Sequence, residues 1–242
     1  MLCVNREYFF KLILFLFGAA FIISCECVTN IETPRLETPS QFSHILYVNA
    51  NSGFDQLKMN TGSEGFILNS YYSEDNFNYK DMLPGTQNFY ITTKSDSVLF
   101  NGLTDLQKGL PYTFIAYGNH SRVQGIILND SIENYTPNNC YFRCINLGNE
   151  TPYIMFRLTS SDPKWQIKPF RTISPFTPTY SGNYNIDILD ATTDSLLLSL
   201  RNRVFAPGKA YSIILRGDFK GIGMQKMDIQ IVESDYMLLK NK

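Results

Sequence analysis

The stretch GLPYTFIAYG at residues 109–118 decides the fold, because it occurs twice. GKAYSIILRG at residues 208–217 matches it, and the two leading glycines are 99 residues apart. Both stretches begin with a turn-forming glycine and continue with aromatic and β-branched residues, which is the pattern of a β-strand that leaves a tight turn. We therefore predict two copies of one β-structured unit.

Four further pairs of segments extend the match in the same order and at nearly constant offset. They are 99–109 with 198–208, 83–91 with 180–188, 45–50 with 142–147, and 125–131 with 229–234. A duplicated unit explains this order. We predict two tandem modules, residues 42–134 and 139–236, joined by the linker NYTPNN at 134–139.

The fold class follows from the periodicity inside each module. YNIDIL at 184–189 alternates polar with apolar residues, as a strand with one buried face does. Pro84-Gly85, Gly109 and Pro207-Gly208 mark turns between such runs, and no window shows a sustained helical stripe. Short strands at this spacing are typical of sandwiches, so we predict an all-β protein with two tandem immunoglobulin-like antiparallel β-sandwich modules.

The N-terminus has the pattern of an export signal. Two basic residues, Arg6 and Lys11, precede the apolar run 12–23, which is shorter than the roughly 20 residues of a spanning helix. Residues 22–25, Ile-Ile-Ser-Cys, resemble the bacterial lipobox. The resemblance implies that residues 1–24 are a lipoprotein signal peptide and that Cys25 becomes the lipidated N-terminus, its sulfur carrying diacylglycerol. An ordinary cleaved signal and an uncleaved anchor are the alternatives.

The residues after Cys25 bear on location. In enteric bacteria an aspartate at the next position retains lipoproteins at the inner membrane, and Glu26 does not match that signal. We therefore expect the outer membrane, on its periplasmic or its cell-surface face. An acidic residue here also resembles the surface-export signal of Bacteroidetes lipoproteins. The polar residues that follow contain Pro34 and Pro39, so 25–41 is predicted to be the lipidated N-terminus and a flexible stalk.

Charge and cysteine spacing exclude several classes of site. A net charge of −1 gives no electrostatic footprint for nucleic acid. Cys140 and Cys144 lie in a predicted strand, where Cα atoms four residues apart are about 13 Å from each other, too far for a disulfide. Buried free thiols on the core face are expected instead. With only His44 and His120 in the chain, no metal site and no cofactor are predicted.

A family resemblance covers residues 42–234, once per module. Its motifs in the first module are YVNA at 47–50, DQLKMN at 55–60, F-x-Y-x-x-x-x-P-G-x-x-x-F-x-I at 77–91 and L-x-x-G-x-x-Y-T at 106–113. This order resembles the DUF4397 family of bacterial exported proteins. Asn49 and Asn146 depart from it, since the family often has histidine there. The resemblance implies a fold and an exported location but no catalytic residues.

The second module carries a Pro-rich insert at 160–178. Its basic and aromatic residues predict a ligand-binding loop, because aromatic faces stack on sugar rings and cations bind acidic groups; they are Lys164, Trp165, Lys168, Phe170 and Arg171. The alternative, which we favour for Trp165, is that this residue packs at the junction between the modules.

No catalytic motif is found, and no catalytic residue is predicted. His44 and His120 are expected on the surface, Asp187 and Asp190 to be solvated, and Tyr112 and Tyr211 to pack at the sandwich edge. We predict a non-enzymatic, lipid-anchored envelope protein with a binding or structural-attachment role. Its expected partners are the membrane, through the lipid, and envelope polysaccharide, another glycan or an outer-membrane protein. The alternative is an envelope hydrolase acting on glycan or peptide at the module junction.

Overall fold

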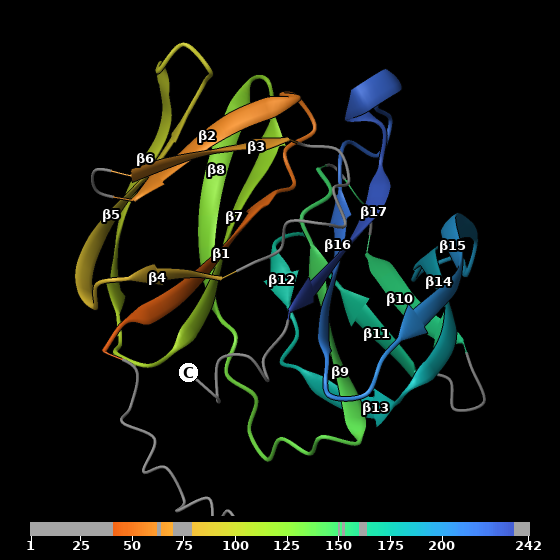
Figure 1. Ribbon diagram of the computed structural model, residues 1–242. Coiled ribbons are helices and arrows are strands. Elements are labelled where there is room, and N and C mark those ends of the chain that lie inside the picture. The colour runs from red at the N-terminus through yellow and green to blue at the C-terminus, as the bar shows by residue number, and fades with distance from the viewer. Residues whose placement is uncertain are drawn as a thin grey trace, which may run out of the picture. The chain divides into compact units, whose positions relative to one another are not determined.

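The computed structural model describes residues 41–61, 64–69, 79–149, 151, 153–159 and 164–234, with 64–69 and 164–168 described by their backbone. Their regular structure consists of strands and one 3₁₀ turn, Gly223–Gln225 (Figure 1). The predicted all-β class is confirmed. No helix in these ranges has the length and apolarity needed to cross a membrane. The predicted signal peptide, lipidation site and stalk lie outside the described residues.

The strands fall into a first half and a second half along the chain. Those of the first half are β1 (Ser43–Asn49), β2 (Gln56–Thr61), β3 (Glu64–Asn69), β4 (Lys80–Met82), β5 (Gly85–Thr92), β6 (Val98–Leu106), β7 (Pro111–Asn119) and β8 (Arg122–Asn129). Those of the second half are β9 (Asn139–Asn146), β10 (Ile154–Thr159), β11 (Lys164–Lys168), β12 (Thr172–Ile173), β13 (Thr177–Tyr180), β14 (Gly182–Asp190), β15 (Leu196–Phe205), β16 (Ala210–Arg216) and β17 (Asp228–Ser234).

Each half contains two sheets. We call the sheet that faces the other half the inner sheet, and the remaining sheet the outer sheet. The inner sheets have the orders β4-β1-β7-β8 and β12-β9-β16-β17, and the outer sheets have the orders β3-β2-β5-β6 and β11-β10-β14-β15. The segments that match in sequence take equivalent positions. Ile45 pairs with Tyr112 in the first half, and Phe142 pairs with Tyr211 in the second.

The pairing differs from a wholly antiparallel sandwich at one place in each half. β1 is parallel to β7, and β9 is parallel to β16. Parallel neighbours need a crossover connection, and here the chain builds the outer sheet of the same half before it returns. The antiparallel description is therefore corrected for these two pairs, while the other strand pairs in the described residues are antiparallel.

Among the described residues, three large hydrophobic cores lie between the four sheets, and a smaller cluster contains Ile132, Tyr141 and Ala210. One core fills the first half, between the sheets of β1 and β2, and another fills the second half, between those of β9 and β10. A third core lies between the two inner sheets and joins the halves; it contains Leu46, Val48, Ala50, Ile115, Tyr117, Ile145, Leu147, Ile214 and Val232. We call this third core the junction core.

The junction core explains the uninterrupted apolar runs of the inner strands. In β1, Ile45 and Tyr47 point into the core of the first half, while Leu46 and Val48 point into the junction core. Every residue of β1 is buried as a result. Outer strands bury one face, and β2 accordingly alternates along its length. The repeated stretch of residues 109–118 is continuous in apolar character because β7 is covered on both sides.

The cysteine prediction is confirmed. Cys140 and Cys144 are free thiols, fully buried, and both face the core of the second half. Their common face follows from the period of two along β9.

Candidate functional site

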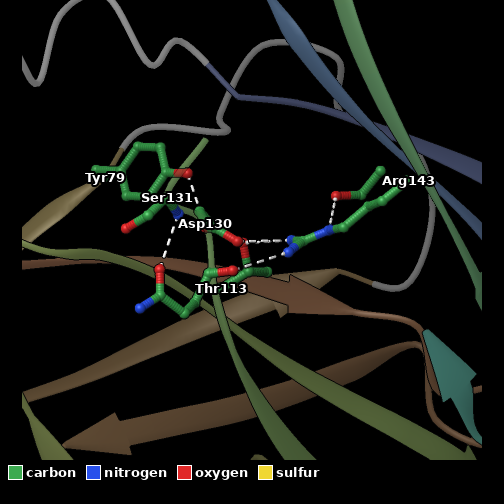
Figure 2. Close-up of polar contacts among 7 residues, drawn as sticks. Tyr79, Thr113, Asp130, Ser131 and Arg143 are labelled. Atoms are coloured by element: carbon green, nitrogen blue, oxygen red, sulfur yellow. Dashed lines mark hydrogen bonds and ion pairs between the residues drawn. The ribbon is translucent and has the colours of Figure 1, made fainter. Parts of the chain in front are cut away.

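A buried ion pair lies where the two halves meet (Figure 2). Arg143 is in β9 between Phe142 and Cys144, whose side chains enter the core of the second half, so the arginine faces the junction. Its Nη2 lies 2.7 Å from Oδ1 of Asp130, the residue that follows β8. The two side chains are 3% and 1% exposed.

Neighbouring groups satisfy both charges (Figure 2). Asp130 Oδ2 accepts hydrogen bonds from the hydroxyls of Thr113, at 2.5 Å, and Tyr79, at 2.8 Å. Arg143 Nε donates to the Ser212 hydroxyl at 2.8 Å, and Nη2 donates to the Thr113 hydroxyl at 3.3 Å. Burial and the adjacent Asp130 charge hold the pKa of Tyr79 well above its ordinary value, so this tyrosine remains a neutral donor.

A groove of about 600 Å³ runs along the junction beside this pair. It is lined by β8, the segment that follows it, and the segment around β12, including Glu133, Arg143 and Phe176. The Arg143 guanidinium carbon lies 4.5 Å from the centroid of the Phe176 ring. Glycoside cleavage requires two facing carboxylates. The described residues of the lining supply one, Glu133.

The insert predicted as one binding loop is instead divided. Lys164, Trp165 and Lys168 belong to β11, which pairs with β10 at the edge of the outer sheet. The loop prediction is wrong for these three residues, because backbone hydrogen bonding to β10 makes them a strand. Trp165 is in register with Arg157 of β10.

Phe170 and Arg171 follow β11 in a turn near the junction. Phe170 is 39% exposed. Arg171 has a φ of 61°, donates its backbone N–H to the Asn146 carbonyl at 2.8 Å, and places its guanidinium carbon 5.8 Å from the Tyr117 ring centroid. Arg171 therefore reaches from the second half to β7 of the first half.

The histidine prediction is wrong for His44. This residue of β1 is buried, and its Nδ1 lies 2.8 Å from Oδ1 of Asp81 in β4. A histidine beside a carboxylate is part of a hydrolase triad. In the described part of the chain, however, Nε2 is buried and has no hydrogen-bond partner, so no nucleophile is in place. His120 is exposed, as predicted, and its ring packs edge-on against the Phe54 ring, with the two ring centroids 4.3 Å apart.

A second charged cluster lies on the outer sheet of the second half. Asp187 of β14 accepts hydrogen bonds from Ser199 Oγ at 2.6 Å and Arg157 Nη2 at 2.9 Å, and Arg201 Nη1 is 3.4 Å away. The expectation that Asp187 is solvated is wrong, because its side chain is 4% exposed. We call Arg157, Asp187, Ser199 and Arg201 the outer arginine cluster.

The pKa of Asp187 reflects opposing effects. Burial alone raises the pKa, but the hydrogen bonds from Ser199 and Arg157 and the charges of the two arginines outweigh it, so the pKa lies below its ordinary value. The carboxylate is ionised at neutral pH. Among the described residues, no three or more His, Cys, Asp or Glu side chains are grouped so that they could hold a metal ion.

Sequence reasoning missed both clusters, although one signal was available. The alternation in YNIDIL places Asp187 on the face opposite Ile186 and Ile188, but its burial depends on arginines from two other strands. Asp130 and Arg143 are 13 residues apart and belong to different halves, so no local pattern connects them.

No protein-family model matches the chain, and no curated protein matches it in sequence. Solved structures similar to it include a candidate adhesin from Bacteroides ovatus, at 10% identity and a TM-score of 0.23, covering 84% of this chain and 98% of that chain. Another is a candidate cell adhesion protein from Bacteroides uniformis, at 5% identity and a TM-score of 0.27, covering 80% and 97%. A third, from Bacteroides ovatus, has 7% identity and a TM-score of 0.27, covering 81% and 98%. Values this low assign neither a family nor a function.

Proposed function

We propose that the protein is a lipid-anchored protein of the bacterial outer membrane, whose two tandem modules form one stiff, non-enzymatic body for binding or attachment. The observation that carries the proposal is the junction. It has its own hydrophobic core and a buried ion pair, Arg143 with Asp130. Domain interfaces within one chain are commonly polar and mobile, whereas this one is built like a domain interior.

A stiff junction suits attachment for a physical reason. A binding surface held on two rigidly joined modules loses little conformational entropy when it meets its partner. The buried pair also restricts how the modules align, because any other alignment leaves a desolvated charge without its partner. The hydrolase alternative needs paired catalytic groups at the junction, and the groove lining described above supplies a single carboxylate.

The anchor part of the proposal rests on the sequence. The lipobox resemblance at residues 22–25 supports lipidation of Cys25, and the DUF4397 resemblance supports an exported all-β protein. Durable anchoring takes more than one acyl chain. A triacylated Cys25 meets that condition.

The test uses the full-length gene expressed in a bacterial envelope. Mass spectrometry of the mature N-terminus is expected to find acylated Cys25, and protease shaving of whole cells then decides which face of the membrane the body occupies. The purified protein, in detergent, is screened on glycan arrays and used to capture partners from solubilised envelopes. Reproducible capture of a glycan or an outer-membrane protein supports the proposal. An unmodified chain that starts at Met1, or turnover of an envelope glycan or peptide, overturns it.

A further inference from the structure

The outer arginine cluster buries its anion and exposes its cations. Asp187 is in register with Arg157 of β10 on one side and Ser199 of β15 on the other. The carboxylate is 4% exposed, while the side chains of Arg157 and Arg201 are 43% and 55% exposed. One buried negative charge thus holds two guanidinium groups that still face solvent.

The first half of the molecule serves as an internal comparison. Its outer sheet has the same strand order, and the corresponding row across β2, β5 and β6 consists of Asn60, Tyr90 and Asn101. This row is neutral, and the Asn88 amide donates to the Tyr90 hydroxyl within it. Burying a carboxylate is unfavourable unless its partners compensate. Because the outer sheet of the first half forms with a neutral row at this position, the architecture does not explain the charged cluster in the second half.

Charge is also distributed unequally between the two outer sheets. The strands of the second outer sheet carry five basic and two acidic residues: Lys164, Lys168, Arg157, Arg201 and Arg203, with Asp187 and Asp190. The strands of the first outer sheet carry one basic residue and two acidic residues: Lys58, with Glu64 and Asp105. Lys164, Lys168 and Arg203 are in register with residues of the core face, so the cations of the outer face are Arg157 and Arg201. Together with the one buried carboxylate of Asp187 they give this face a net positive charge.

An apolar row lies beside the charged row on the same face. Met155, Leu189 and Leu196 are in register across β10, β14 and β15, two residues along from Arg157 and Asp187. Leu196 is 54% exposed. Leu189 is buried, so the apolar surface next to the two guanidinium groups is formed by Leu196 and the half-buried Met155. A uronic acid has the matching form, with a C–H face on its ring and a carboxylate at its edge.

From these observations we propose that the outer face of the β11-β10-β14-β15 sheet binds carboxylate-bearing sugar chains. Arg157 and Arg201 contact the carboxylates, because a planar guanidinium can donate two parallel hydrogen bonds to such a group. Asp187 is a positioning residue that holds the two arginines in place before the ligand arrives. This inference rests on the binding role proposed above and names its ligand class.

The direct test is a binding titration of the full-length protein in detergent with polygalacturonate. Methyl-esterified polygalacturonate is the matched probe, since it has the same sugar backbone with its carboxylates capped. Binding to the free acid is expected to be at least tenfold tighter and to weaken as salt is added. Equal binding to both probes overturns the proposal. So does equal binding to dextran sulfate, whose anionic groups are sulfates and not carboxylates, or to phosphatidylglycerol vesicles, because the site would then recognise negative charge alone.

Single variants separate recognition from net charge. Arg157→Gln and Arg201→Gln are each expected to weaken polygalacturonate binding about tenfold, which corresponds to about 1.4 kcal/mol. The control is Lys58→Gln, which removes one positive charge from the first outer sheet and is expected to change binding less than twofold. Asp187→Asn makes the surface more positive. If Asp187 positions the two arginines, this variant is expected to bind polygalacturonate about tenfold more weakly. Tighter binding of polygalacturonate contradicts the role of Asp187.

A double variant distinguishes loss of binding from loss of the fold. Arg157→Asn with Asp187→Tyr transplants the neutral residues of the first outer sheet into the second. This variant is expected to melt within a few degrees of the wild type and to lose binding. If it is folded and binds polygalacturonate normally, the proposal is wrong. If no acidic sugar binds the wild type while envelope capture still finds a partner, this inference fails and the proposed function stands.

Discussion

At the residue scale, Arg143 shows how a charge can be used inside a protein. It is the one charged residue of β9, and each of its nitrogens has a partner on the other side of the junction or in the neighbouring strand β16. Removing one partner of such a pair destabilises the fold more than replacing both partners with apolar residues, because the remaining charge stays desolvated. The pair therefore makes the junction sensitive to single substitutions.

Asp130→Asn keeps the shape of this site but removes its negative charge. We expect the free energy of unfolding to fall by about 3–5 kcal/mol, as measured by urea denaturation. The control is Asp96→Asn, which acts on the exposed pair with Lys58 and is expected to change stability by less than about 1 kcal/mol. Asp96 has a φ of 63°, which asparagine tolerates. A similar small effect at both positions would show that water reaches Asp130.

Because the Cys140 thiol is buried, we expect the free energy of unfolding to fall at alkaline pH. Burial raises its pKa from 9.0 to about 11. The folded state binds the thiol proton more tightly than the unfolded state does. The stability that this proton contributes is therefore fully present below pH 9 and is lost as pH rises from 9 to about 11. By pH 10 the loss is about 1.4 kcal/mol. Urea midpoints from pH 8 to 10 should therefore fall more steeply for the wild type than for Cys140→Ala, and parallel slopes would contradict this.

At the element scale, β7 and β16, the inner strands that pair in parallel with the first strand of each half, begin in the same way. Gly109 and Gly208 adopt φ values of 77° and 76°, a region that favours glycine. Three residues later, the hydroxyls of Tyr112 and Tyr211 accept the backbone N–H groups of Gln107 and Ala206, at 3.0 and 2.9 Å. Each tyrosine closes the turn before its own strand, as in the tyrosine corner of β-sandwiches.

Tyr112→Phe and Tyr211→Phe each leave one backbone donor without its acceptor. We expect each to lower the free energy of unfolding by about 1–3 kcal/mol, and by similar amounts, because the two turns have the same geometry. Tyr180→Phe is the control, since Tyr180 is 70% exposed, and it is expected to stay within about 0.5 kcal/mol of the wild type. Denaturation curves of the three variants decide this. Neutral values at both turns would contradict the role of the hydroxyls.

At the scale of the whole molecule, the junction core couples the two halves. Its side chains come from both inner sheets, and Ile214 and Ile145 of the second half are fully buried there with Ile115 of the first. A shared core means that neither half can open without exposing apolar surface of the other. The described strands should therefore unfold as one unit.

Ile214→Ala tests this coupling. Truncation of a buried isoleucine lowers stability by about 2–5 kcal/mol, and we expect hydrogen-exchange protection to fall by the same amount in β5 and in β14. Val204→Ala, at a position 68% exposed, is the control and should leave both strands protected. Loss of protection in β14 alone would show that the halves unfold independently.

The features that the sequence predicted well are local ones. Turn glycines, β-branched runs and a period of two act over a few residues, and they identified β7, β14 and β16 as strands. The same period placed Cys140 and Cys144 on one core face. The repeat itself was visible because both copies keep these local signals.

Only the tertiary structure decided which strands are buried on both faces and which polar side chains are removed from water. His44 and Asp187 were expected on the surface, and both are buried, because their partners come from other strands. Lys164, Trp165 and Lys168 form a strand because β10 offers an edge to pair with. Sequence by itself determined the strands, the all-β class and the core-facing thiols. The junction and the two charged clusters depend on groups brought together from distant positions, and the burial that gives those charges their meaning does not exist until the sheets have stacked.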